Sequence, residues 1–310
     1  MKKKLLILCL LFLSKNLSAQ LLSDSIPHQQ QILTSQWAYK KTAGILMTQT
    51  SFVNWSAGGT NSVAGTLLLD IAYNYKEKKS FWNNSFKGRF GLNSEEGDSP
   101  KKTDDVFEII STFGYKKTQK SNWYYSAQFN FRTQFANGYR YPDRENAISK
   151  FFSPAYLFLG VGSQYTNPKK KYKFYLSPLT NKITIVLDER LANLGAFGVD
   201  KAQYDDEGVL IKEGEKAKIE IGTLLTGEWE KEIMENITMN NKLILYSDFL
   251  NSFGNIDLDW ELKIQLKVNK YVKANIGTHI IYDDDIHEEE SGVPKVQLKQ
   301  ILGVGLSYDF

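Results

Sequence analysis

Residues 256–268 alternate strictly between apolar and polar side chains, and no other feature of the sequence constrains the fold as much. The apolar members are Ile256, Leu258, Trp260, Leu262, Ile264, Leu266 and Val268. The polar members between them are Asp257, Asp259, Glu261, Lys263, Gln265 and Lys267. Because successive side chains of a β-strand point to opposite faces, this segment predicts a long strand with one apolar face and one strongly charged face.

Eleven further segments alternate in a similar way, so the sequence predicts twelve strands. They are approximately residues 41–49, 62–75, 81–94, 105–116, 122–133, 155–165, 172–187, 215–229, 237–249, 271–283 and 296–310. Most reach or exceed the roughly 9–11 residues that a tilted strand needs to cross a bilayer. In the segment 172–187 the apolar parity shifts after Pro178, which predicts a β-bulge or kink there.

The connections between these segments alternate between short and long. The short ones lie near residues 76–80, 117–121, 166–171, 230–236 and 269–270. The longer ones lie near residues 51–61, 95–104, 134–154, 188–214, 250–255 and 284–295. Strands with one apolar face also occur in soluble sandwiches, but short periplasmic turns and longer extracellular loops are typical of outer-membrane barrels. The sequence therefore predicts an all-β, transmembrane outer-membrane β-barrel of about 12 antiparallel strands.

Aromatic residues cluster beside the predicted short turns, where an interfacial girdle is expected. They are Tyr73, Tyr75, Trp82, Tyr115, Trp123, Tyr125, Tyr165, Tyr172 and Tyr308. The run Gly305, Tyr308, Phe310 resembles the terminal signal by which outer-membrane proteins are recognised for assembly, although Gly303 stands where that signal usually has a polar residue. The expected partners are therefore the barrel-assembly machinery, outer-membrane lipid and lipopolysaccharide.

The first nineteen residues predict a cleavable signal peptide. Three lysines at positions 2–4 precede an apolar run at residues 5–13, and Ala19 supplies a small residue at the exit. The apolar run is too short to span a bilayer as a helix. A lipoprotein signal centred on Cys9 is disfavoured, because the residue before it is a bulky leucine. We predict export to the outer membrane of a Gram-negative cell, a short periplasmic segment at residues 20–36 and a barrel at residues 37–310.

Cleavage at this point changes both the cysteine count and the charge. It would remove the single cysteine, so the mature chain has no thiol for a disulfide, a metal site or a nucleophile. It would leave 34 of the 38 lysines and arginines against 35 acidic residues. A nearly neutral chain lacks the basic surface that nucleic acid requires, so that partner is excluded. We predict no cofactor and no metal.

Three stretches carry a distinctive pattern. They are Asn54-Trp55-Ser56-Ala57-Gly58-Gly59, Leu194-Gly195-Ala196-Phe197-Gly198-Val199 and residues 248–260. Together they resemble a Bacteroidota family of outer-membrane β-barrels known as domain of unknown function 3078. The resemblance implies a barrel over nearly the whole mature chain; the family has no assigned activity, so no catalytic residue can be carried over from it. In the first stretch, Asn54, Trp55, Gly58 and Gly59 are expected to form a tight turn of the first extracellular loop rather than a ligand clamp.

Two groups of residues carry side chains suited to chemistry. His279 has the parity of the lumen near the extracellular rim, with Asp283 two pleats away, and hydrolases use histidine with Ser or Asp. A single histidine with polar neighbours is more typical of a barrel wall, so no catalytic residue is predicted. The acidic stretch 283–290 lacks the staggered spacing of a calcium loop, and we interpret it as a solvated loop able to bridge cations to lipopolysaccharide.

Strand parity predicts a lumen lined by charges of both signs. The expected lining residues are Lys87, Arg89, Glu108, Gln128, Asn130, Arg132, Lys218, Glu220, Lys242, Asp257, Asp259, Glu261, Lys263, Lys267 and Lys273. Side chains fill barrels of eight strands, while barrels of sixteen or more leave a water channel, and twelve lies between. The favoured hypothesis is a narrow pore or binding channel for a small polar solute. The alternatives are a closed barrel whose loops 134–154 and 188–214 contact partners, and an outer-membrane hydrolase that uses His279.

Overall fold

The computed structural model describes residues 37–310, except residues 52–59, 251–253, 285 and 287–293. The predicted signal peptide, the segment 20–36 and the loop residues Asn54, Trp55, Gly58 and Gly59 lie outside the described residues. These predictions therefore stay predictions.

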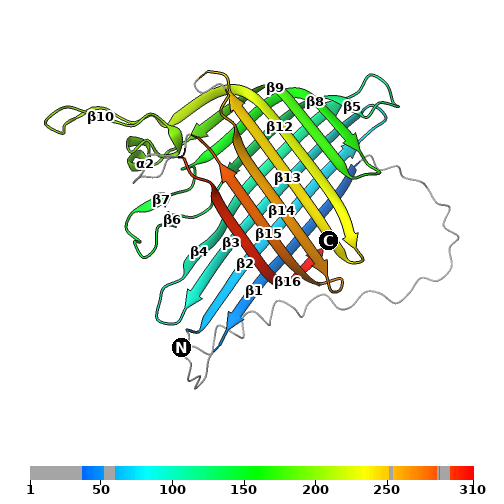
Figure 1. Ribbon diagram of the computed structural model, residues 1–310, viewed down its shortest axis with the longest axis horizontal. Helices are drawn as coiled ribbons and strands as arrows, with labels where there is room; N and C mark the ends of the chain where they lie inside the picture. Colours follow the sequence, from blue (N-terminus) through cyan, green and yellow to red (C-terminus); the bar gives the residue numbers. More distant parts are fainter. Residues whose placement is uncertain (1–36, 52–59, 251–253, 285, 287–293) are drawn as a thin grey trace, which may run out of the picture. The chain divides into compact units, whose positions relative to one another are not determined.

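In the described part of the chain, twelve strands form a closed antiparallel barrel (Figure 1). They are β1 (Trp37–Thr50), β2 (Ser62–Lys76), β3 (Ser80–Glu95), β4 (Lys101–Tyr115), β5 (Trp123–Thr133), β8 (Ala155–Asn167), β9 (Tyr172–Ile185), β12 (Ala217–Met234), β13 (Ile237–Asp248), β14 (Asp257–Lys267), β15 (Val272–Tyr282) and β16 (Gln297–Asp309). Strands that follow one another along the barrel wall are paired, and β1 pairs with β16 to close the ring. The predicted fold of twelve antiparallel strands is confirmed.

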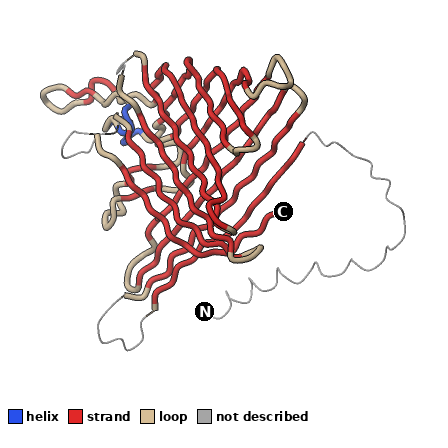
Figure 2. The backbone as a smooth tube through the Cα atoms, turned by 45° about the vertical axis from the view of Figure 1, so that its right-hand side comes forward, coloured by secondary structure: helices blue, strands red, loops and turns tan. Residues whose placement is uncertain are grey.

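The remaining elements belong to two long connections. The connection between β5 and β8 contains β6 (Gly138–Tyr139) and β7 (Ala147–Ser149). The connection between β9 and β12 contains α2 (Glu189–Asn193), η1 (Ala196–Gly198), β10 (Gln203–Tyr204) and β11 (Leu210–Lys212). Figure 2 shows the helix among loops, while strands make up most of the described backbone. No helix among the described residues is long and apolar enough to cross a membrane.

Asp188 anchors the second of these connections. Its side chain caps α2 by accepting a hydrogen bond from the Leu191 amide, and it forms an ion pair with Lys150 of the first connection. Burial alone would raise the pKa of the Asp188 carboxyl, but the hydrogen bonds from Lys150 and from the Leu191 amide hold it below its usual value. The two connections are thus tied together at the same end of the barrel.

A β-bulge interrupts β9 at Pro178, as the shift of parity predicts. Thr180 pairs with Gly222 of β12, whereas Ser177 pairs with Leu224, so β9 has one residue more than its partner in this interval. The Ser177 hydroxyl donates to the Val161 carbonyl at 3.0 Å and accepts from the Thr180 hydroxyl at 2.7 Å. The extra residue reverses the alternation. Inward-pointing side chains of β9 therefore have odd numbers before the bulge and even numbers after it.

Gly162 of β8 lies directly against this bulge, and its substitution is expected to destabilise the barrel. A Cβ atom added at Gly162 would lie 2.0 Å from the carbonyl oxygen of Leu176, and backbone of a paired strand cannot move aside. Overpacking of this kind costs about 1–3 kcal/mol, so Gly162→Ala is expected to lower the melting temperature of the detergent-solubilised barrel. Gly227→Ala is the control, since no heavy atom lies within 4 Å of its added Cβ. Equal melting temperatures of the two variants would contradict the close approach.

The outward face of the barrel is apolar. Leu67, Val161, Leu302 and Leu306 are outward-facing and 55–75% exposed, with Leu302 at 74%. Towards the short turns, aromatic rings pair on this face, as Trp37 does with Tyr75 at 5.2 Å and Trp123 with Tyr165 at 5.1 Å between centroids. A continuous exposed surface of this composition is unfavourable in water and is suited to a bilayer.

Candidate functional site

The register of the strands sets two groups of charged residues at one level of the lumen. On one wall Glu108 of β4 lies opposite Lys87 of β3 and Arg132 of β5. On the other wall Glu261 of β14 lies opposite Lys242 of β13 and His279 of β15. Each group mixes acids with bases. Parity within a strand predicts that these side chains point inward, and the barrel closure then turns the two groups toward each other.

Three ion pairs connect the two walls, and we call them the transverse pairs. They are Lys87 Nζ with Glu261 Oε2 at 3.3 Å, Arg132 Nη1 with Asp259 Oδ2 at 3.0 Å, and Lys242 Nζ with Glu108 Oε1 at 3.5 Å. In each pair the two strands are not neighbours but lie on opposite sides of the ring. The side chains therefore reach across the lumen and form its constriction.

Two of the three transverse pairs keep part of their surface accessible to solvent. The side chains of Lys87 and Glu261 are 30% and 31% exposed, and those of Arg132 and Asp259 are 28% and 24% exposed. In the third pair the side chain of Lys242 is 19% exposed and that of Glu108 only 6%. Ion pairs that keep about a quarter of their surface accessible to solvent contribute little to stability. Two of the three transverse pairs are therefore accessible to solvent, and the pair of Lys242 with Glu108 is largely buried.

Other charged residues that the sequence predicts in the lumen lie closer to the two ends. Arg89 binds both carboxylate oxygens of Asp70 at 2.7 Å, and Lys273 lies 3.7 Å from Asp309. Lys263 and Lys267 continue the charged face of β14 toward the short turns. Lys218 lies near the long loops, opposite Thr184 of β9. The structure thus brings six of the predicted residues into the transverse pairs. The residues nearer the two ends of the barrel take no part in these pairs.

Lys182 of β9 is the main lining residue that the sequence analysis missed. Its ammonium lies 2.9 Å from Asp257, 3.5 Å from Glu220 and 3.8 Å from Asp283. The parity shift at Pro178 was the signal that could have found it. Since the apolar residues after the bulge are Ile183 and Ile185, the even-numbered Lys182 had to point inward.

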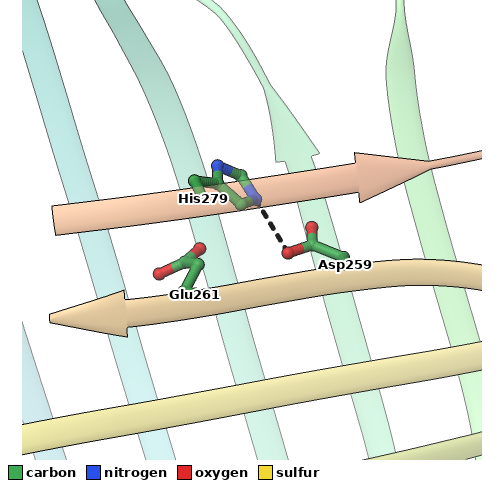
Figure 3. A group of neighbouring side chains, drawn as sticks. All are labelled: Asp259, Glu261 and His279. Atoms are coloured by element: carbon green, nitrogen blue, oxygen red, sulfur yellow. Dashed lines mark hydrogen bonds and ion pairs between the residues drawn. The ribbon is translucent and has the colours of Figure 1, made fainter. Parts of the chain in front are cut away.

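His279, Asp259 and Glu261 form a compact group in the lumen (Figure 3). The His279 Nε2 atom lies 2.8 Å from Asp259 Oδ1, whereas strand parity pointed to Asp283 as its partner. Within the described residues no hydroxyl or thiol is hydrogen-bonded to His279, so this pair lacks a nucleophile. Both carboxylates are also bound by the cations of Arg132 and Lys87, which compete with a metal ion. Asp259 and Glu261 of this group thus belong to the transverse pairs.

A cavity of about 430 Å³ lies beside the constriction, at the end of the barrel that carries the long loops. Its apolar and aromatic lining residues include Tyr156, Phe158, Leu224, Ile244 and Tyr246. Its charged lining residues are interleaved with these in the strand register and include Arg132, Lys182, Asp257, Asp259 and Asp283. Its volume is in the range of pockets that bind small molecules.

These features define the class of the protein as a closed antiparallel β-barrel with an apolar outer face and a charged, constricted lumen. Residues 47–139 match the family model described as "Protein of unknown function (DUF3078)". The predicted resemblance to this family is confirmed over that part of the chain, which includes the segment 54–59. The segments 194–199 and 248–260 lie outside the matched residues.

Comparison with solved structures gives similarities in barrel fold at low identity. An outer membrane channel from Pseudomonas putida F1 has 10% identity and a TM-score of 0.41, and the match covers 89% of this chain and 98% of that one. The translocator domain of the autotransporter NalP from Neisseria meningitidis has 10% identity, a TM-score of 0.35 and 88% coverage of each chain. The NanC porin has 9% identity and a TM-score of 0.34, with 88% and 98% covered. No curated protein matches the chain.

Proposed function

We propose that the chain is an integral outer-membrane β-barrel that lets small polar solutes pass through a narrow, charged lumen. The apolar outer face, with aromatic rings near the short turns, supports insertion in a bilayer. In this proposal residues 1–19 are a cleaved signal peptide, the long connections are extracellular and the short turns are periplasmic. Lipopolysaccharide, outer-membrane lipid and the barrel-assembly machinery are the proposed partners.

The solvent accessibility of two of the three transverse pairs carries the proposal. Lys87 with Glu261 and Arg132 with Asp259 join opposite walls, yet each side chain keeps about a quarter to a third of its surface accessible to water. A solute that passes this level meets fixed charges of both signs between walls of low dielectric constant, which strengthen their field. Such a constriction favours small polar or charged solutes over large or apolar ones.

A closed barrel that acts through its loops is the second candidate. Lys182 and Glu220 are only 4% and 3% exposed, so one side of the lumen is filled by side chains. The connections that contain β6, β7, α2, β10 and β11 are structured, as a surface that contacts partners requires. In this alternative the transverse pairs stabilise the barrel and no solute passes.

Single-channel recording of the purified full-length protein in a planar bilayer distinguishes the two. We expect small, stepwise currents in potassium chloride, because the lumen is narrow and hydrated. Replacing one transverse pair in the double variant Arg132→Gln, Asp259→Asn is expected to widen the constriction and raise the single-channel conductance severalfold. The control is Lys212→Met with Glu215→Gln, which removes an exposed ion pair in the long connection. Absence of current steps from both the natural protein and the Arg132, Asp259 variant would favour the closed barrel.

A further inference from the structure

A groove of about 480 Å³ lies on the outer face of the barrel, close to the short turns. It extends over β5, β8, β9, β12 and β13, which are neighbours in the wall (Figure 1). One residue from each of these strands pairs in register to form a row, which consists of Trp123, Tyr165, Phe174, Gly227 and Leu243. The glycine leaves a gap between the large side chains of this row, and we call the gap the Gly227 groove.

The Gly227 groove is open and is bounded by aromatic rings. A Cβ added at Gly227 would have no heavy atom within 4 Å, so among the described residues nothing fills the space above it. Trp123, Phe174 and Trp229, which line the groove, are 54%, 40% and 43% exposed. Trp229 pairs with Tyr172 at the edge nearest the short turns. An exposed hollow of this composition on an apolar outer face suits an acyl chain of a lipid.

The polar residues that also line the groove are paired within the protein. Lys173 Nζ lies 3.0 Å from a carboxylate oxygen of Glu228, so these two charges cancel. The Asn241 side-chain carbonyl accepts a hydrogen bond from the Trp260 indole at 3.3 Å. The groove itself therefore offers no net charge, and the part of a ligand that lies in it is apolar.

Two basic turns border the groove on its short-turn side. They comprise residues 116–122, directly before Trp123, and residues 168–171, directly before Tyr172. The Thr166 amide donates to the Asn122 carbonyl at 3.0 Å, so the two turns are adjacent. They contain no acidic residue and six lysines, at positions 116, 117, 120, 169, 170 and 171. A ligand with an apolar part in the groove thus meets positive charge at one end.

The excess of positive charge persists when neighbouring acids are counted. Lys171 forms an ion pair with Glu230 at 2.5 Å. The next turn contributes Glu230, Glu232 and Glu235 against Lys231, so seven lysines stand against three acids around the groove. Four of the lysines are exposed and have no ion pair among the described residues, namely Lys117, Lys120, Lys169 and Lys170. They remain available to an anionic group.

The spacing between the groove and the lysines fits one phospholipid. Tyr172 lies two residues from Phe174, which is about 7 Å along the strand, and the lysines begin directly beyond Tyr172. The polar layer of a bilayer is roughly 5–8 Å thick on each side. A phosphate at the level of Lys170 therefore lies about one headgroup above an acyl chain in the Gly227 groove.

We propose that the Gly227 groove and the two basic turns bind an anionic phospholipid of the periplasmic leaflet. One acyl chain lies over Gly227, and the phosphate accepts charge-assisted hydrogen bonds from Lys169 and Lys170. Lys117 and Lys120 add to the positive potential that favours an anionic headgroup. The inference rests on the proposed function, because it takes the outer face as lipid-facing and the short turns as periplasmic.

Native mass spectrometry of the full-length barrel in detergent tests the acyl-chain part of the site. The probes are dioleoylphosphatidylglycerol, which is anionic, and dioleoylphosphatidylcholine, which has the same chains and no net charge. We expect one phosphatidylglycerol to bind about ten times more tightly than phosphatidylcholine. Gly227→Phe fills the groove and is expected to weaken that binding about tenfold. The control is Gly65→Phe, since Gly65 pairs with the exposed Met47 and Leu92 and its added Cβ also has open space.

A second pair of variants tests the headgroup part of the site. Lys169→Gln with Lys170→Gln is expected to lower the affinity for phosphatidylglycerol to about that for phosphatidylcholine and to leave phosphatidylcholine binding unchanged. The control is Lys201→Gln with Lys216→Gln, which removes the same charge from exposed positions in the long connection between β9 and β12. This control is expected to retain the preference for phosphatidylglycerol.

The outcomes separate this inference from the proposed function. Equal binding of the two lipids by the natural protein, or equal losses in Gly227→Phe and Gly65→Phe, would overturn the inference, and channel currents would then still support the pore. Displacement of phosphatidylglycerol by an equal concentration of lipopolysaccharide would also overturn it, in favour of a lipopolysaccharide site. Preference for phosphatidylglycerol in a barrel that passes no current would support the lipid site and contradict the pore. If Gly227→Phe does not fold, the lysine variants and the two lipids decide.

Discussion

Replacing both Tyr308 and Phe310 by aspartate is expected to prevent the protein from assembling in the outer membrane. These residues lie at the seam that closes the barrel, where residues 42–47 of β1 pair with residues 304–309 of β16, whereas β1 pairs with β2 along its whole length. Tyr308 lies opposite Ala43, and the Phe310 amide donates to the Lys41 carbonyl at 2.9 Å. A change at this short seam therefore affects the closure of the barrel, the step in which the last two free strand edges pair with each other.

The physical cost of the substitution has two parts. The Tyr308 and Phe310 rings stack at 6.1 Å and are more than half exposed on the outer face, where a charge costs up to a few kcal/mol at mid-bilayer depth and less near the interface. The second part is recognition, since the run Gly305, Tyr308, Phe310 is the proposed assembly signal. The structure also requires glycine at position 305, because an added Cβ would lie 2.2 Å from the Ile45 carbonyl oxygen.

Fractionation of the cell envelope and gel mobility before and after boiling measure the outcome. The natural protein is expected in the outer-membrane fraction and to migrate differently once boiled, because a closed barrel resists detergent. The double aspartate variant is expected to be absent from that fraction or degraded. The control exchanges the aromatics, Tyr308→Phe with Phe310→Tyr, and is expected to assemble normally. Normal insertion of the aspartate variant would show that the terminal aromatics are dispensable.

The sequence could predict the barrel because alternation persists wherever one face of a strand meets lipid and the other meets the lumen. The prediction failed at strand ends because the alternation between an apolar and a polar face is lost there. β12 continues to Met234, beyond the predicted end at residue 229, since Glu230 and Lys231 pair with β13 although both faces there are polar. The short elements β6, β7 and α2 were not predicted, because two to five residues are too few to show a period.

The composition of the lumen could be predicted, but its pairing could not. Parity within one strand shows that Lys87 and Glu261 point inward, yet it contains no information on which strands face each other across the ring. That depends on the number of strands and on their stagger, which only the closed barrel fixes. Lys182 was missed because a single extra residue at Pro178 reverses the parity of everything that follows it in β9.

Removing the acidic ladder of β14 is expected to change the ion selectivity of the pore toward anions. The triple variant is Asp257→Asn, Asp259→Asn, Glu261→Gln. In the natural protein these carboxylates are bound by Lys182, Arg132 and Lys87 respectively. Their removal takes three negative charges from the constriction and leaves the three bases in place. A positive potential between walls of low dielectric constant then attracts anions.

The expected measurement is the reversal potential across a tenfold gradient of potassium chloride, which should shift toward the equilibrium potential of chloride. The control is a second triple variant with the same chemical changes, Asp205→Asn, Asp206→Asn, Glu207→Gln, in the exposed hairpin of β10 and β11. It alters the net charge of the protein equally but leaves the lumen intact. A similar shift in both variants would attribute the effect to the surface of the protein.

Thermal unfolding of the same variant then decides whether the lumen is hydrated or packed. Arg132 and Lys87 keep about 30% of their side-chain surface in water, so the loss of Asp259 and Glu261 leaves them solvated at little cost. Lys182 is 4% exposed but retains Glu220 and Asp283, so the loss of Asp257 alone removes one of its three partners. A hydrated pore therefore predicts shifted selectivity with a modest fall in melting temperature. In a closed barrel the same substitutions would leave buried basic side chains without their acidic partners. The free energy of unfolding would then fall by several kcal/mol, and the barrel would pass no current. Lost stability together with unchanged selectivity would exclude the pore.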